Sequence, residues 1–131
     1  MTPARHVVLD ASVLLRRLRR RSAEADAVIR GDRLAAPALI AAETASGLLT
    51  EMRFADLELG RAAALLQEAL NLPLELVPDA ELAAEALPIG AALGLSAYDA
   101  LYVALAERLH APLVTADSRL AERYDRCELI P

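Results

Sequence analysis

Short β-branched or apolar runs alternate with longer segments of helical periodicity along the whole chain. The runs that we expect to form strands are HVVLD (6–10), RLAAP (33–37), LELV (74–77), the LVT segment just before Asp117, and CELI (127–130). The segments between them carry leucine and alanine at helical spacing. This alternation predicts an α/β three-layer sandwich, in which a mostly parallel central sheet is flanked by helices. The length of 131 residues predicts one domain over 1–131.

The basic residues restrict the chemistry that this chain can perform. All fourteen are arginine, which excludes a Walker-type phosphate lysine, a Schiff-base lysine and a lysine general base. The two histidines, His6 and His110, stand alone, and we expect structural roles for them at a strand start and a helix end. The single cysteine, Cys127, has no internal disulfide partner and cannot build a zinc site by itself. Polar chemistry therefore depends mainly on carboxylates.

The net charge of −5 argues against nucleic-acid binding through bulk charge. The local exception is the run RRLRRR, in which Arg16, Arg17, Arg19 and Arg20 are possible phosphate contacts; a solvated helix face is the alternative interpretation. No apolar run reaches the roughly 20 residues that a membrane span needs. The N-terminal segment lacks the features of a signal peptide, so we expect a cytoplasmic protein without a membrane partner.

Four acids stand where a strand ends or within a predicted helix. Asp10 ends the first strand, Asp117 follows the LVT strand, and Asp99 lies in the first turn of a helix. Glu43 is an isolated acid among small apolar residues of the helical segment 38–54. Ligands of parallel α/β sheets bind outside the carboxyl ends of the strands. We therefore expect Asp10 and Asp117 to lie near the same edge of the sheet.

Each of these acids also has a structural explanation. Asp10 and Asp117 suit helix N-caps, and Asp99 suits the third helical position of a capping box that begins at Ser96. Glu43 suits a solvent-facing helix position. Capping and metal binding are compatible, because a carboxylate has two oxygens. Only the joint arrangement of the four acids is informative.

This order of acids resembles that of the PIN-domain ribonucleases, and most closely that of their small bacterial VapC toxins. The matching stretches are VVLDASVLL, APALIAAETASGLL, LGLSAYDALYVALAERLHAPLVTAD and SRLAE. They cover nearly the whole chain, and YDALYVALA with PLVTAD is their most specific part. The resemblance implies a PIN fold and a Mg²⁺- or Mn²⁺-dependent endoribonuclease. It also implies a homodimer that is held inactive by a VapB-type antitoxin.

The resemblance also assigns residues to the site. The acidic metal-site positions fall on Asp10, Glu43, Asp99 and Asp117, and the polar positions that line such a site fall on Ser12 and Thr115. We expect the three aspartates to hold the principal ion, with the glutamate completing the site or binding a second ion. The expected reaction is hydrolysis of RNA phosphodiester bonds by metal-activated water. With 3% aromatic residues, base stacking contributes little, so RNA shape and backbone contacts would select the substrate.

The residue types suit this chemistry independently of the resemblance. Hard divalent cations prefer carboxylate oxygens, and a bound ion lowers the pKa of its water without help from histidine or lysine. Converging carboxylates repel one another, and a cation relieves that repulsion. Two alternatives remain: a catalytically silent binding module with the same fold, and a phosphatase with Asp10 as nucleophile. The phosphatase usually needs a second acid two residues later, where Ser12 stands.

Overall fold

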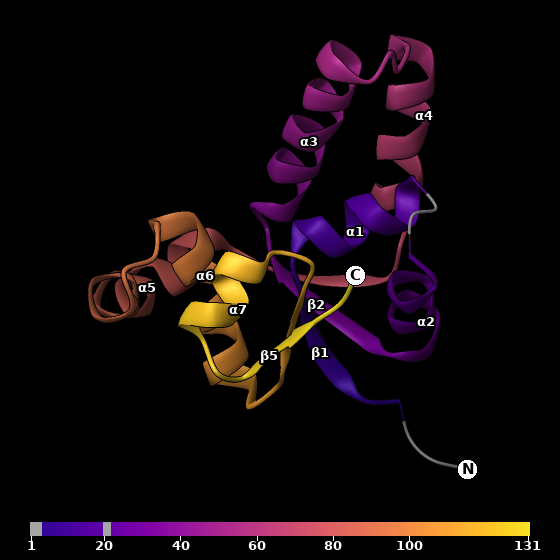
Figure 1. The fold of residues 1–131 in the computed structure, drawn as a ribbon. Helices are drawn as coiled ribbons and strands as arrows, with labels where there is room; N and C mark the ends of the chain where they lie inside the picture. The colour runs from indigo at the N-terminus through magenta and orange to yellow at the C-terminus, as the bar shows by residue number, and fades with distance from the viewer. Residues whose placement is uncertain (1–3, 20–21) are drawn as a thin grey trace.

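The structure is a computed structural model that describes residues 4–19 and 22–131 (Figure 1). Within these residues, the strands are β1 (His6–Leu9), β2 (Arg33–Pro37), β3 (Leu74–Val77), β4 (Leu113–Thr115) and β5 (Cys127–Leu129). The helices are α1 (Ala11–Leu18), α2 (Ala23–Gly31), α3 (Ile40–Phe54), α4 (Leu59–Leu70), α5 (Asp79–Leu93), α6 (Ala97–Leu109) and α7 (Ser118–Arg123). The strand ranges expected from the sequence are confirmed to within one residue.

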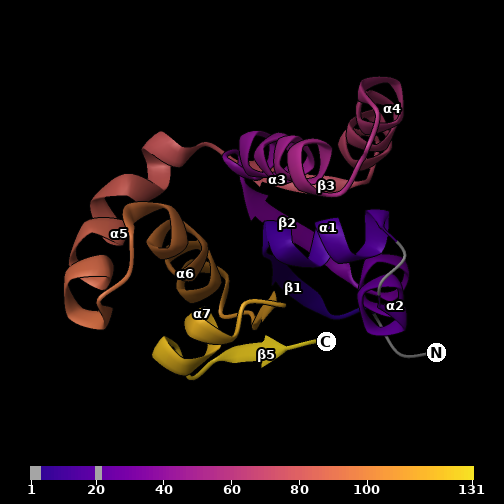
Figure 2. The same ribbon diagram turned by 45° about the horizontal axis from the view of Figure 1, so that its top comes forward.

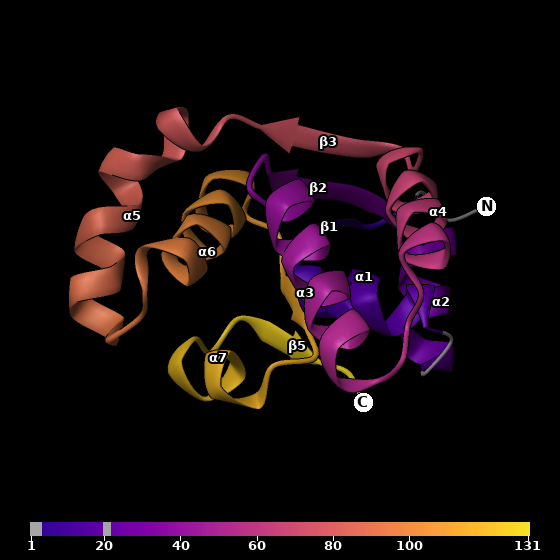
Figure 3. The same ribbon diagram turned by 90° about the horizontal axis from the view of Figure 1, so that it is seen from above.

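The described strands form one sheet in the order β3-β2-β1-β4-β5, and all of their pairings are parallel. Val8 is paired with Ala35 of β2 on one side and with Leu113 of β4 on the other, so β1 is the central strand. Helices α1 to α4 cover one face of the sheet, and α5, α6 and α7 cover the other (Figures 2 and 3). The three-layer α/β sandwich with a parallel sheet is confirmed.

The direction of the chain across the sheet reverses between β1 and β4. From β1 the chain moves outward through β2 and β3, and it then returns to β4 and continues outward to β5. Because parallel crossovers are right-handed, the two directions place their helices on opposite faces of the sheet. A crevice opens at such a switch point, outside the carboxyl ends of the two central strands. Asp10 directly follows β1, and Asp117 is the second residue after β4, so the topology brings both to this crevice.

The core surrounds β1, β4 and α6. All three apolar residues of β1 after His6 are fully buried, and every residue from 100 to 106 of α6 is buried as well. This helix lies between the sheet and α5, which explains why its apolar residues are not confined to one stripe. Among the described residues no single helix is long and apolar enough to cross a membrane; α5 and α6 together reach the required length and composition, but they are bent by 110°.

Two local expectations are wrong. The sequence predicts a helix break at Pro88, but α5 runs through this residue without interruption. Pro88 lies on the exposed side of α5, where a helix tolerates the missing N–H better than in the core. The helical wheel also predicts Leu49 on the core side of α3, whereas that side chain is 48% exposed and the buried residues are Ile40, Thr44 and Leu48. The distal part of α3 projects beyond the sheet beside α4 (Figure 1), so the sheet does not cover this side of it.

Candidate functional site

Asp10 is held by two hydroxyl groups that come from different parts of the chain. Its side chain is buried, and Oδ2 accepts a hydrogen bond from Ser12 Oγ at 2.5 Å and another from Thr115 Oγ1 at 2.8 Å. Although Asp10 stands at the N-cap position of α1, its side chain makes no capping hydrogen bond. The expectation of a plain N-cap is therefore wrong, and the carboxylate is oriented by its two hydroxyl donors.

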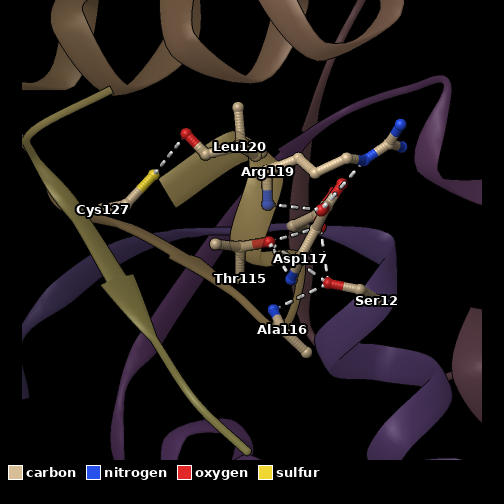
Figure 4. Close-up of polar contacts among 8 residues, drawn as sticks. Ser12, Thr115, Ala116, Asp117, Arg119, Leu120 and Cys127 are labelled. Atoms are coloured by element: carbon tan, nitrogen blue, oxygen red, sulfur yellow. Dashed lines mark hydrogen bonds and ion pairs between the residues drawn. The ribbon is translucent and has the colours of Figure 1, made fainter. Parts of the chain in front are cut away.

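The same hydroxyls fix the turn between β4 and α7. Ser12 Oγ accepts a hydrogen bond from the amide of Ala116 at 2.9 Å, and Thr115 Oγ1 accepts one from the amide of Asp117 at 3.0 Å. Figure 4 shows both hydroxyls pointing into the space between the start of α1 and this turn. Each hydroxyl thus accepts a hydrogen bond from a backbone N–H and donates a hydrogen bond to Asp10 Oδ2. Ser12 and Thr115 orient the carboxylate, which explains why polar residues occur at these positions.

Asp117 and Asp99 are both at helix starts, as the sequence predicts. Asp117 caps α7, because its Oδ1 accepts the amide of Arg119 at 3.0 Å. Ser96 caps α6 by accepting the amide of Asp99 at 3.1 Å, so the capping role of this SAYD segment is confirmed. Both acids are half-buried and remain accessible from the crevice.

Glu43 is not the solvent-facing glutamate of the structural alternative. It is half-buried near the start of α3, and its Oε1 accepts a hydrogen bond of 2.6 Å from the hydroxyl of Tyr102. Tyr102 is fully buried on α6, three residues after Asp99 and therefore on the same side of that helix. This bond connects the two helical layers at the carboxyl edge of the sheet. Tyr102 is the site residue that the sequence argument missed, although its i+3 spacing from Asp99 was a usable signal.

The four acids influence one another electrostatically. Burial raises the pKa of Asp10, and the charge of Asp117 raises it further, while the two hydroxyl donors oppose the change. Burial also raises the pKa of Glu43, where the Tyr102 hydroxyl opposes the change and Asp10 and Asp99 add to it. The pKa of Asp99 is raised by burial and then by Asp10 and Asp117. These mutual effects show that the acids share one neighbourhood, and that ionising them together costs free energy.

The donor chemistry of this neighbourhood fits a hard divalent cation, but the ligands are not assembled around one point. In residues 4–19 and 22–131, no group of three His, Cys, Asp or Glu side chains is arranged to hold a metal ion. All four acids offer oxygen ligands, and burial, followed by the charges of neighbouring acids, raises the pKa values of Asp10, Glu43 and Asp99. A shared ion would therefore require some carboxylates to rotate toward one another.

Two described members of the arginine run at the end of α1 form ion pairs with acids of this chain. Arg17 forms ion pairs with an acid of α4 at 3.1 Å and an acid of α2 at 3.5 Å, and Arg19 forms one with an acid of α3 at 3.1 Å. Arg16 lines a separate surface pocket between α1 and α3. Arg20 lies outside the described residues. These pairs favour a structural role for Arg17 and Arg19 over an RNA track.

The family profile described as "PIN domain" matches residues 7–126. The chain belongs to the PIN-domain family. Ribonuclease VapC9 of Mycobacterium tuberculosis is 39% identical over 116 residues, which cover 88% of this chain and 89% of that protein. Among solved structures, PAE2754 from Pyrobaculum aerophilum superposes with a TM-score of 0.75 at 26% identity, covering 95% of this chain and 82% of that one. VapBC2 from Rickettsia felis, crystallised with a promoter DNA fragment, gives 0.63 at 16% identity, covering 95% and 96%, and so supports the fold alone.

Proposed function

We propose that residues 1–131 form one PIN-type nuclease domain that hydrolyses RNA phosphodiester bonds with Mg²⁺ or Mn²⁺. The observation that carries this proposal is the position of Asp10, Glu43, Asp99 and Asp117 near the switch point of the sheet, where burial and then the charges of neighbouring acids raise the pKa values of Asp10, Glu43 and Asp99. The 39% identity to a protein named ribonuclease VapC9 supports RNA as the substrate class. VapC-type toxin activity follows from the same likeness.

In this proposal, the three aspartates hold the principal ion and Glu43 completes the site or holds a second ion. When bound, the ion would supply charge compensation for the reacting phosphate and a lowered pKa for an attacking water. The protein's own contribution is positional. Ser12 and Thr115 hold Asp10 through Oδ2, and Tyr102 holds Glu43 through Oε1. These hydrogen bonds orient two of the four carboxylates, so fewer side chains would have to reorient when an ion binds.

The proposal is tested by cleavage of an RNA pool with the purified protein in Mg²⁺ or Mn²⁺. Asp10→Asn and Asp99→Asn are expected to lose cleavage by at least about 100-fold while remaining folded, because each removes a charged ligand. Asp26→Asn is the matched control, since Asp26 pairs with Arg30 on α2 at 3.0 Å and should leave cleavage unchanged. Undiminished cleavage by folded Asp10→Asn and Asp99→Asn would contradict the assignment.

Calorimetric titration with MnCl₂ separates the nuclease from a catalytically silent binding module of the same fold. The nuclease is expected to bind Mn²⁺ and to lose binding in Asp10→Asn. A wild-type chain that binds no divalent cation and cleaves no RNA would instead support the silent module. The absence of a preassembled ligand group among the described residues makes this titration necessary.

The partners that we propose are a VapB-type antitoxin and a second copy of this chain. The likeness of the fold to a solved VapBC pair is consistent with an antitoxin, and the neighbouring reading frame is the direct place to look for it. Co-expression should produce a complex in which RNA cleavage is suppressed. Light scattering should give about twice the 14.0 kDa chain mass for the isolated protein. A monomer at micromolar concentration would contradict the homodimer.

A further inference from the structure

A surface pocket of about 510 Å³ opens beside the acids between α6 and α7. Its lining includes Asp99 and Asp117 together with Arg119 and Arg123. The pocket therefore combines two candidate metal ligands with two cations in a chain whose net charge is −5. An RNA phosphate approaching these acids needs a nearby cation, because the chain as a whole repels it.

The two arginines of the pocket differ in how they are held. Arg123 donates Nη1 to the carbonyl oxygens of Leu93 and Gly94, both at 3.3 Å, and so covers the end of α5. The Arg119 side chain is 89% exposed, and its only ion pair within the described residues is a long one, 3.8 Å from Nε to Asp117 Oδ1. An exposed pair of this length holds an arginine weakly. Arg119 is thus the cation in the pocket that is available to a ligand.

We propose that Arg119 contacts an RNA phosphate next to the acids and leaves Asp117 when a divalent cation binds there. The inference rests on the proposed nuclease function and extends it to a substrate-binding residue. Figure 4 shows the Arg119 side chain running from α7 past the Asp117 carboxylate, so a small rotation redirects the guanidinium. A guanidinium is planar and donates paired N–H groups, which match two phosphate oxygens. Neutralising Asp117 with a cation removes the attraction that now holds Arg119.

In this arrangement Arg119 has opposite effects on the two ligands: it opposes binding of the cation and favours binding of the phosphate. Before the cation binds, the positive charge of Arg119 lies beside Asp117, and both side chains line the same pocket as Asp99. It therefore competes with a divalent cation for the same acids. Once the cation is bound, the same positive charge favours the phosphate. Removing Arg119 should weaken RNA binding without weakening cation binding. If its role were purely structural, its removal would weaken both.

The experiment compares Arg119→Gln with Arg33→Gln. Arg33 is an exposed arginine at the amino end of β2, on the edge of the sheet opposite the acids, so it controls for the lost charge. For Arg119→Gln we expect KM for RNA to rise about 10-fold. The slope of log(kcat/KM) against log[salt] should become shallower by about 0.7, the value of one phosphate contact on a single strand. Calorimetry with MnCl₂ alone should show equal or tighter binding.

The outcomes separate the two proposals. If the wild type cleaves RNA and Arg119→Gln matches Arg33→Gln in KM and salt slope, Arg119 is not a phosphate contact. If Arg119→Gln loses Mn²⁺ binding and unfolds at a lower temperature, its role is structural and the inference is also overturned. Arg119→Lys should keep the salt slope but recover only part of KM, because an ammonium lacks the forked donors. A wild type that neither cleaves RNA nor binds it in Mg²⁺ overturns the proposed function and this inference with it.

Discussion

Replacing Asp10 with asparagine should stabilise the metal-free protein at pH 7. Burial and the charge of Asp117 raise the pKa of Asp10 even though two hydroxyls bond its carboxylate, so the ionised form is disfavoured in the fold. Each unit by which a folded-state pKa exceeds the unfolded value costs about 1.4 kcal/mol once the group is ionised in both states. Asparagine is uncharged, nearly isosteric, and still accepts hydrogen bonds. The raised pKa therefore predicts that Asp10→Asn has a larger free energy of unfolding than the wild type at pH 7.

The same raised pKa values make the stability of the metal-free protein depend on pH. Asp10, Glu43 and Asp99 all have raised pKa values, so between the unfolded and folded values the native state binds more protons. The stability of the metal-free wild type should therefore increase as the pH falls through the raised pKa values of these acids. It should drop again at lower pH, where the solvated acids that form ion pairs become protonated. In Asp10→Asn, this increase should be smaller.

Urea unfolding in EDTA measures these free energies at pH 7 and pH 5. Asp26→Asn serves as the control, because Asp26 is half-exposed, pairs with two arginines and should show no gain. Adding Mn²⁺ at ten times its Kd should stabilise the wild type by about 1.4 kcal/mol and the variant much less. The electrostatic reasoning fails if Asp10→Asn is less stable than the wild type in EDTA at pH 7 and shows the same pH dependence.

Three further substitutions and modifications test single contacts of the structure. Thr115→Val removes a buried donor to Asp10 and the acceptor of the Asp117 amide, so the free energy of unfolding in urea should fall by about 1–3 kcal/mol. An unchanged urea midpoint would contradict a stabilising role for these two hydrogen bonds. Gly94→Ala should lower the free energy of unfolding by about 1–2 kcal/mol, because Gly94 has φ of 67° and Arg123 Nη1 would lie 2.6 Å from an added Cβ. Gly31→Ala is the control and should not lower it, because no atom lies within 4 Å of an added Cβ there. Burial raises the pKa of Cys127 to about 11, so its alkylation by iodoacetamide at pH 8 should be about 100-fold slower than that of free cysteine. A Cys127 thiol that reacts at the rate of free cysteine would show that it is not buried as described.

The sequence predicts the strands well because each is a short apolar run between charged or turn-forming residues. β2 and β3 begin and end at the residues expected, and the caps at Ser22 and Ser96 form as the local pattern requires. Such features depend on neighbours within a few positions. The uninterrupted α5 and the buried side of α3 depend instead on where each helix lies in the assembled fold, and a periodicity argument has no access to that.

The site shows the same division between local and long-range information. Its acids could be selected from the sequence because strand ends and helix starts are locally visible. The family resemblance also assigned Ser12 and Thr115, which lie 103 positions apart, whereas Tyr102 was missed because it lies 59 positions from its partner Glu43. The assignment of all four acids to one metal remains a prediction, because the described residues contain no assembled ligand group. The sequence left the arginine run open as a possible phosphate contact or a solvated helix face, and two of its described members, Arg17 and Arg19, form ion pairs within the chain.

The positions of the acids explain how an acidic chain can maintain such a site. Asp10 and Asp117 follow adjacent central strands, whose separation is fixed by the hydrogen bonds of the parallel sheet. Glu43 and Asp99 lie on helices of opposite layers, and the Tyr102 hydroxyl bridges these layers at the site. Repulsion among the acids can therefore be relieved by small movements of α3 and α6 without disturbing the strands. A cation bound here would replace the repulsion among the acids with attraction, and it would draw the two helical layers together over the strand ends.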